Sequence, residues 1–249
     1  MGTFGRRLLL AVDAKGYGGA DAVTQRQLQE AIRRLLSEAA AASGLEWERW
    51  ETQVGGDSVF AVLPEGASEP DLVDTFMRHL DAGLRAFNHG RVRAAWLRLR
   101  AVVHFGSASP GAIGFVGRAP VEVGRMLDSA ALKAALAAAP DACLALAVSP
   151  TVFNDVISDA YTTIRAQEFR EVVVAEKEHT GRAWIRVPGY DARALDLGVP
   201  SGAGREGATG GGEVPDVRPP SAPTAPGDTV VQVINGTVHA PGSVFGISK

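Results

Sequence analysis

Hydrophobic and polar positions along residues 6–190 alternate between strand-like and helix-like spacing. The run RRLLLAVD predicts a buried strand over 6–13 that ends on an acid. A helix should follow from about Thr24, because apolar residues at 28, 32, 35 and 36 fall on one face. Thr24 and Gln27 have the spacing of a capping box, and Gly44 should end this helix.

The next segment predicts a β-hairpin and a second helix. EWERWETQ alternates and DSVFAVL is apolar, so with the Gly-Gly turn between them they favour a hairpin whose first strand is half exposed. Ser68 should cap a helix with Pro70 in its first turn. The inward positions of this helix are Leu72, Phe76, Leu80, Leu84 and Phe87. The sequence NHG should end it, and WLRLRAVVHFG predicts a fourth strand.

The order β-α-β-β-α-β is that of an α+β, ferredoxin-like fold. In this topology the first strand lies beside the third and antiparallel to it. Asp13 ends the first strand and Asp57 precedes the third, so we expect the two to be neighbours although 44 positions separate them. Two adjacent carboxylates repel each other, and a divalent cation with oxygen ligands relieves that repulsion.

Composition divides the chain into a domain over 1–190, a linker over 191–227 and an apolar segment over 228–249. Residues 198–227 include 14 Gly or Pro among 30, and such a segment cannot pack a core. DTVVQVINGTVHAPGSVFGISK then becomes apolar and β-branched, with no formal charge between its two ends.

Charge argues against one class of function, and cysteine content indicates the compartment. The net charge of −3 argues against a general nucleic-acid binder, which usually has a basic excess. The single Cys143 lies in an apolar run and indicates a buried thiol in a reducing compartment. The N-terminal apolar run is too short for a membrane span or a secretory signal, so we expect a cytoplasmic protein.

Five segments in order resemble the class III nucleotidyl cyclases, the adenylate and guanylate cyclase catalytic domains. LLLAVDAKGYGG and QVGGDSVFAV are similar to the two metal-binding segments of that family. LRLRAVVHFGSASPGAIGFVG, APVEVGRMLDS and VVVAEKEHTGRAWIRV are similar to the segments that follow, and the likeness spans residues 6–188. The implied fold is a βαββαβ core extended by C-terminal helices and a β-hairpin.

This resemblance implies a site for a nucleoside triphosphate at a homodimer interface. Asp13 and Asp57 match the ligands of two divalent ions, Mg²⁺ or Mn²⁺. Arg125 matches the arginine that stabilises the transition state, and Lys177 matches the lysine that binds phosphate. The family works as head-to-tail homodimers, in which one subunit supplies the metals and the other supplies Arg and Lys.

The base-binding positions depart from the family. Gln53 stands where the base-selecting lysine is found, Gly114 stands near its acidic partner, and Val121, or Glu122 in the neighbouring register, stands at the ribose-orienting asparagine. We assign substrate binding to Gln53, Tyr17 and Gly56. The loss of the purine-selecting residues leaves room for a pyrimidine substrate, as in antiphage cyclases of this superfamily.

Other interpretations of the same residues stay open. GGDSVFAVLPEG also resembles the diguanylate cyclase signature, although Ser58 replaces an acid there. Asp13 fits a turn aspartate, Arg125 fits a helix residue whose charge reaches solvent, and Lys177 fits a surface pair with its glutamate neighbours. Trp47, Trp50 and Trp96 could form the dimer face. His104 is typical of a hydrogen-bonded core histidine.

The C-terminal segment resembles bacterial amyloid signalling motifs. It combines high β-propensity, an Asn-Gly turn and no internal charge, which is the profile of cross-β segments. Docking on its own domain and disorder are the alternatives. We therefore expect a nucleotidyl cyclase of bacterial signalling or antiphage defence, or a catalytically inactive cyclase-like module, assembled with a partner that carries a similar motif.

Overall fold

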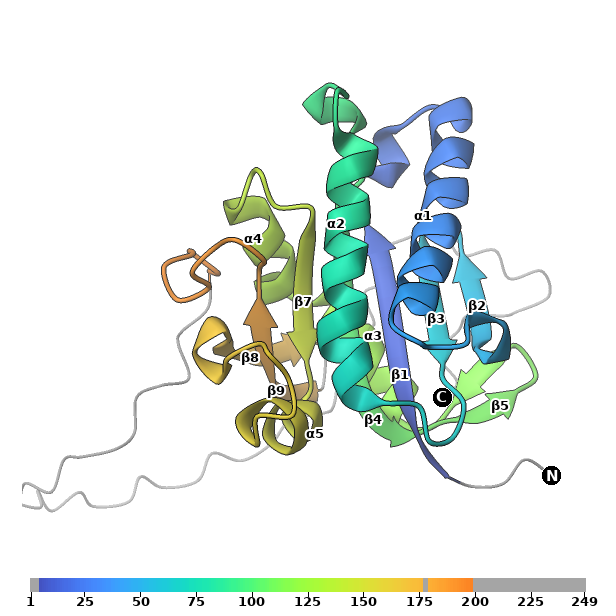
Figure 1. Ribbon diagram of the computed structural model, residues 1–249, viewed down its shortest axis with the longest axis vertical. Coiled ribbons are helices and arrows are strands. Elements are labelled where there is room, and N and C mark those ends of the chain that lie inside the picture. Colours follow the sequence, from blue (N-terminus) through green and yellow to red (C-terminus); the bar gives the residue numbers. More distant parts are fainter. Residues whose placement is uncertain (1–4, 177–178, 199–249) are drawn as a thin grey trace, which may run out of the picture. The chain divides into compact units, whose positions relative to one another are not determined.

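A seven-stranded sheet in the order β2-β3-β1-β4-β7-β9-β8 forms the centre of the described part of the chain (Figure 1). The computed structural model describes residues 5–176 and 179–198. The strands of this sheet are β1 (Arg6–Ala14), β2 (Glu51–Gly55), β3 (Ser58–Val62), β4 (Leu99–Ser107), β7 (Leu144–Val148), β8 (Arg170–Glu176) and β9 (His179–Arg186).

The predicted βαββαβ core is confirmed. Strand β1 lies antiparallel to β3 on one side and to β4 on the other, and β2 pairs antiparallel with β3. Strand β4 pairs in parallel with β7, which extends the sheet to the β8–β9 hairpin. The fold class is therefore the predicted α+β arrangement.

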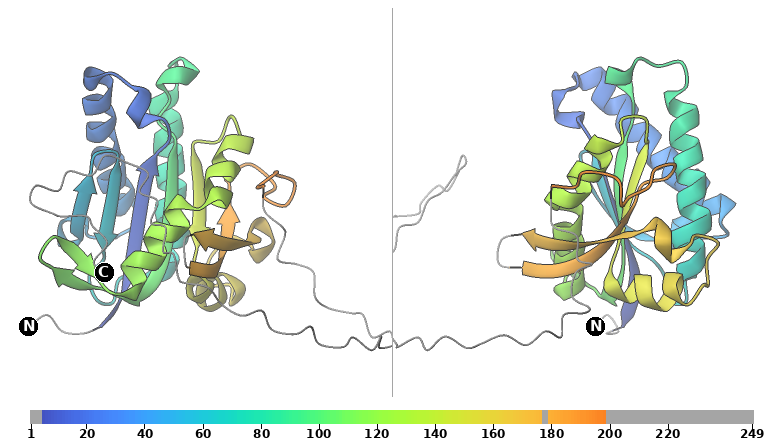
Figure 2. Two further views of the ribbon diagram at one scale, coloured as in Figure 1. Left: turned by 180° about the vertical axis from the view of Figure 1, so that it is seen from behind. Right: turned by 90° about the vertical axis from the view of Figure 1, so that its left-hand side faces the viewer.

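Helices cover both faces of the sheet (Figure 2). One face carries α1 (Ala22–Ala42) and α2 (Met77–Asn88), which continues from a π-helical turn (Asp71–Phe76). The opposite face carries α3 (Arg118–Asp128) and α4 (Ala130–Ala138). Two buried apolar clusters result, and the first contains the predicted inward residues Leu72, Phe76, Leu80 and Leu84. Ser68 accepts a hydrogen bond from the Asp71 main-chain N–H at 3.3 Å, as an N-terminal cap should.

Two local predictions are wrong. Helix α1 begins at Ala22 because the Asp21 carboxylate accepts the Thr24 main-chain N–H at 2.8 Å, so Asp21 is the cap in place of Thr24. The segment expected as the first hairpin strand is a short 3₁₀ turn over Trp47–Arg49, and only Glu51–Gly55 is extended. That strand, β2, is exposed along its length, because it is the edge strand of the sheet.

The chain after β4 adds elements to both faces of the sheet. Strands β5 (Ser109–Gly111) and β6 (Gly114–Val116) form a small hairpin before α3, and α5 (Pro150–Val152) follows β7. Short helical turns occupy Tyr17–Gly19, Arg93–Ala95, Phe153–Ser158 and Ala166–Glu168. Leu195 and Leu197 pack against the second cluster, so the packed domain reaches beyond residue 190. The segment at 228–249 lies outside the described residues.

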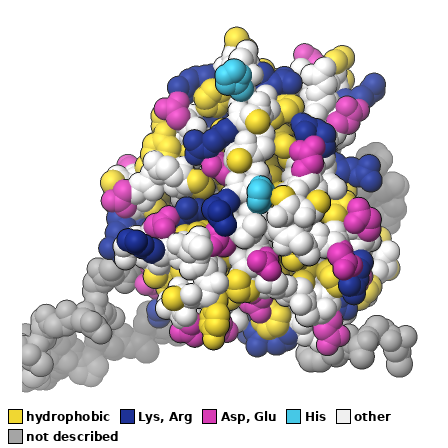
Figure 3. Space-filling model, in the orientation of Figure 1, with side chains coloured by type: hydrophobic (Ala, Val, Ile, Leu, Met, Phe, Trp, Pro, Cys, Tyr) yellow, Lys and Arg dark blue, Asp and Glu magenta, His cyan; other side chains and the backbone are white. Residues whose placement is uncertain are grey.

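The surface agrees with the modest net charge. On the face that carries α1 and α2, basic and acidic side chains are interspersed (Figure 3). Cys143 is a free, buried thiol, as predicted. Within residues 5–176 and 179–198, no helix combines the length and apolar character that a membrane crossing requires.

Candidate active site

Asp13 and Asp57 come together where β1 ends and β3 begins. Asp13 faces Ser58 in the β1–β3 register, and the next main-chain N–H, that of Ala14, donates to the Asp57 carbonyl at 3.2 Å. The turn that carries Asp57 needs a left-handed residue, which Gly56 supplies with φ of +64°. The pairing of β1 with β3 therefore brings the two predicted acids together at one end of these strands.

The Asp13 carboxylate is already paired with a cation from the same chain. Arg100 faces Asp13 across the β1–β4 pair, and its guanidinium donates to Asp13 Oδ2. Only 14% of the Arg100 side chain and 17% of the Asp13 side chain are exposed. This arginine was missed by the sequence prediction, although Arg98 and Arg100 interrupt an otherwise apolar strand.

Several charged groups lie close enough to Asp13 to shift its pKa. Burial raises the pKa of Asp13 above its ordinary value, Arg100 opposes that rise, and the carboxylates of Asp57 and Asp128 add to it. Asp128, at the C-terminal end of α3, was also missed. Three acids and one guanidinium thus interact at the same end of the sheet, which favours a role in binding a polyvalent cation or its phosphate partner.

Helix α3 carries the predicted transition-state arginine. Arg125 is half-buried on α3, and Val121, one turn earlier, is 53% exposed. At the two positions predicted for the ribose-orienting group, Val121 has no hydrogen-bonding side chain, and Glu122 pairs with Arg118. Lys177 lies outside the described residues.

Gln53 and Gly114 are in contact. A Cβ atom at Gly114 would lie 2.3 Å from Gln53 Oε1, so the Gln53 side chain occupies the space that a larger residue at 114 would need. Gln53 also lines a cavity of about 220 Å³ with Phe60 and Phe115. The two positions expected to select the base therefore do lie together, but they present one amide and no charge.

Tyr17 lies beside the hairpin turn and is hydrogen-bonded to α1. Its hydroxyl accepts the Gln29 Nε2–H at 2.6 Å, and its ring packs against the first apolar cluster. A Cβ at Gly56 would lie 4.0 Å from Tyr17 Cε1, so the ring lies beside the hairpin turn. Gly56 and Asp57 line a second cavity of about 330 Å³ between this hairpin and α1.

The two acids fit a magnesium or manganese site only in part. Within the described residues, no group of three or more His, Cys, Asp and Glu side chains could hold a metal ion. Mg²⁺ is commonly held by one or two carboxylates together with the oxygens of substrate phosphates. Asp13 and Asp57 suit that donor set, provided that Arg100 leaves or shares Asp13.

The structure also tests the predictions for His104 and Trp50. His104 is buried, with its Nε2 atom 3.3 Å from a Glu122 carboxylate oxygen, but its Nδ1 atom has no partner within the described residues. It is therefore only partly satisfied. Trp50 is 7% exposed and packs against Trp47, so it cannot form a dimer face as predicted.

Comparison with solved structures supports the observed fold. No protein-family model and no curated protein matches the sequence. Among solved structures, the chain is similar to the guanylyl cyclase Cya2, with 13% identity and a TM-score of 0.50 over 79% of this chain and 98% of that one. It is also similar to an adenylate/guanylate cyclase/hydrolase from Silicibacter pomeroyi, with 17% identity and a TM-score of 0.52 over 75% and 99% of the two chains. The chain has the nucleotide cyclase fold.

Proposed function

We propose that this protein is a nucleotidyl cyclase that acts as a homodimer. The observation that carries the proposal is the meeting of Asp13 and Asp57 at the end of β1, within this fold. In the proposed reaction the ribose 3′-oxygen of a nucleoside triphosphate attacks the α-phosphorus and gives its proton to water. The bond from that phosphorus to the pyrophosphate oxygen breaks, which gives a 3′,5′-cyclic nucleotide and pyrophosphate.

Asp13 and Asp57 would hold two Mg²⁺ or Mn²⁺ ions, which supply charge stabilisation and a more acidic 3′-hydroxyl. The geometry supports this assignment because Asp13 faces Ser58, the residue after Asp57, and the Ala14 N–H donates to the Asp57 carbonyl. Arg100 would then serve as the counter-charge of Asp13 before the cations arrive. Its guanidinium also lies close enough to this corner to contact the incoming phosphates.

Arg125 and Lys177 would come from the second subunit and act on the phosphates. The half-buried position of Arg125 on α3 supports this role, because a guanidinium there is partly shielded from water. Gln53, Tyr17 and Gly56 would contact the substrate. The uncharged Gln53–Gly114 corner favours a base other than the usual purines, including a pyrimidine.

The direct test is pyrophosphate release from each of the four nucleoside triphosphates with Mn²⁺. We expect release with at least one, its loss in Asp57→Ala, and its retention in Asp159→Ala, which removes an exposed acid elsewhere on the domain. Product detection by mass spectrometry separates a cyclase from a simple triphosphatase. Release that survives Asp57→Ala would remove the acid pair from the mechanism.

Mixing two inactive variants tests the shared site. If metals come from one subunit and Arg125 from the other, an Asp57→Ala and Arg125→Ala mixture forms heterodimers with one intact site. Random pairing makes half of the dimers mixed, so activity should return to about one quarter of wild type. If the mixture releases no pyrophosphate although each variant still dimerises, the site is not shared between subunits in this way.

A catalytically inactive module is the second candidate. The Arg100–Asp13 pair and the apolar Val121 favour it, because both depart from a site ready for metal and ribose. The module would assemble through residues 228–249 with a partner that carries a similar motif. Silence with all four nucleotides, together with thioflavin-positive fibres from a peptide of that segment, supports this candidate.

A further inference from the structure

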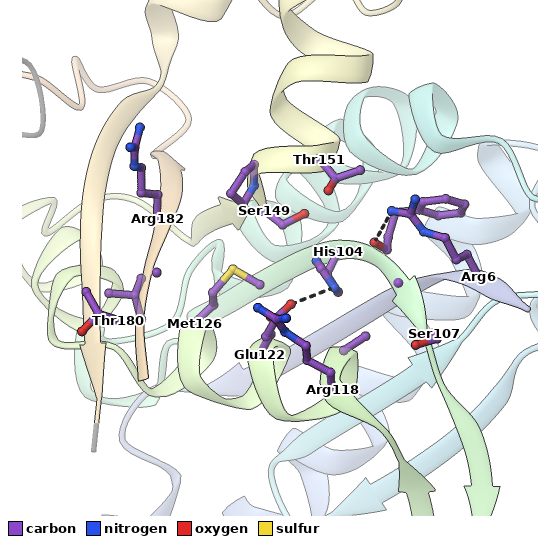
Figure 4. A pocket seen from close by; sticks show the side chains of 16 residues that line it. Arg6, His104, Ser107, Arg118, Glu122, Met126, Ser149, Thr151, Thr180 and Arg182 are labelled. Atoms are coloured by element: carbon purple, nitrogen blue, oxygen red, sulfur yellow. Dashed lines mark hydrogen bonds and ion pairs between the residues drawn. The ribbon is translucent and has the colours of Figure 1, made fainter. Parts of the chain in front are cut away.

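A cavity of about 540 Å³ opens at the end of β4 far from Asp13 (Figure 4). Its walls come from residues 104–107 of β4, the first turns of α3, the start of α5 and the β8–β9 hairpin. Asp13 pairs with the opposite end of β4, at Arg100. The volume is in the usual range of small-molecule sites, roughly 300–1,000 Å³.

A buried histidine lines this cavity with part of its hydrogen-bonding capacity unused. His104 is 7% exposed; Glu122 lies 3.3 Å from Nε2, and Nδ1 lacks a partner among the described residues. Burial lowers the pKa of His104, while Glu122 opposes that change, so the imidazole is neutral at physiological pH. The ring fits there because residue 106 is glycine: a Cβ would lie 2.6 Å from His104 Nε2. Buried polar atoms without partners are rare in native proteins, and this one belongs to a residue of the cavity wall.

The rim of the cavity carries three arginines. Arg118 donates to Glu122 at 2.6 Å, and Arg182 pairs with Glu171 at 3.3 Å. Arg6 lies over the Phe105 ring at 4.7 Å and donates to the Phe105 carbonyl. A guanidinium has five N–H donors, so each of these groups retains donors beyond the bonds named here. The residues that line the cavity thus include three arginines and one acid, Glu122, which already pairs with Arg118, and this excess of positive charge favours an anionic ligand.

Hydroxyl groups complete the wall. The Ser149 main-chain N–H donates to the Val103 carbonyl at 3.1 Å, which holds Ser149 beside the His104 stretch of β4. Thr151 and Thr180 line the cavity from α5 and β9. In Figure 4, Ser149 and Glu122 lie on either side of His104, with Arg182 and Arg6 farther out on opposite sides.

We propose that this cavity binds a small organic anion that carries one oxyanion group toward Arg6 on one side and another toward Arg182 on the other, while its polar body reaches His104 and Glu122. Arginine suits phosphate and carboxylate groups because its planar fork donates paired hydrogen bonds to their oxygens. The proposal does not use the acid pair or Arg125, because the cavity does not include Asp13, Asp57 or Arg125.

Calorimetric titration of the full chain with inorganic phosphate and, separately, with malonate tests the proposal. We expect saturable binding of at least one probe, and the tighter probe identifies the anionic group of the ligand. Loss of one charge-assisted hydrogen bond should weaken binding at least about tenfold in Arg182→Gln and in Arg6→Gln. Arg34→Gln is the matched control, because Arg34 forms an exposed pair with Glu38 on α1.

A second readout places the anion. The imidazole signals of His104 in ¹H–¹³C NMR spectra should shift along the same titration curve as the heat. Absence of saturable binding by both probes would overturn the proposal. Binding that persists in Arg182→Gln and disappears in Arg125→Gln would also overturn it, because the anion would then lie in the proposed catalytic cleft.

Discussion

Replacing Arg100 with methionine tests the electrostatic account of the acid corner. The change leaves the Asp13 carboxylate, whose side chain is 17% exposed, without its only named cationic partner and still beside Asp57. Breaking a fully buried ion pair costs about 3–5 kcal/mol. Because both side chains retain some solvent contact, we expect a loss of about 2–3 kcal/mol in the free energy of unfolding.

Urea unfolding at neutral pH measures this loss, and a double-mutant cycle isolates the pair. Asp13→Asn removes the charge that Arg100 neutralises, so the double variant should be more stable than the sum of the single effects predicts, by about 2 kcal/mol. Arg34→Met is the control and should stay within about 0.5 kcal/mol of wild type, because its ion pair is exposed. An equally small effect of Arg100→Met would refute the reasoning.

The pH dependence gives a second check on this variant. The pKa of Asp13 is raised on folding, so its contribution to stability is fully present below the ordinary value of 3.8 and is lost as pH rises through the folded-state pKa. Removing Arg100 raises that pKa further. The deficit of Arg100→Met should therefore be small in acid and grow toward neutral pH, whereas a packing defect would be independent of pH.

Three further predictions concern residues around the sheet. Folding lowers the pKa of His104, so the contribution of this residue to the free energy of unfolding is complete above the ordinary pKa of 6.5. The free energy of unfolding should fall by at most about 1.4 kcal/mol per pH unit as the pH decreases below that value. His104→Gln should flatten this slope when unfolding is measured as a function of pH. Gly114→Ala should destabilise by about 2 kcal/mol because φ is +118°, and Gln53→Ala should not rescue it if the backbone is the cause. Arg98→Met should lower the free energy of unfolding by about 3 kcal/mol, because Arg98 donates to the carbonyls of Leu136, Ala139 and Ala142 at the C-terminal end of α4. A loss under about 1 kcal/mol would show that water replaces these hydrogen bonds at about equal free energy.

The sequence was sufficient to predict the βαββαβ order and the meeting of Asp13 with Asp57. Both follow from topology, because the strand after a hairpin turn must lie beside the first strand for the two helices to cover one face. The partner of Asp13 could not be predicted in this way. Arg100 faces Asp13 only in the observed register of β1 and β4, and packing of the whole sheet fixes that register.

Local competition explains the remaining differences. Asp21 and Thr24 are both good caps, and the structure uses the earlier one because its carboxylate reaches the Thr24 N–H. Trp50 has the pattern of a surface aromatic, yet it is buried against Phe76, 5.7 Å away between ring centroids. The contact of Gln53 with Gly114 joins two distant segments and has no local signal in the sequence.

One strand, β4, carries the arginine beside the acids at one end and the histidine of the cavity at the other. His104 lies four positions after Arg100, which is about 13 Å at roughly 3.3 Å per residue in a strand. A bound anion at that distance acts only weakly on Asp13 through its charge, since the Debye length in physiological salt is about 8 Å. The two ends also share helix α3, which packs along this strand and carries Glu122 at the cavity and Asp128 near the acids.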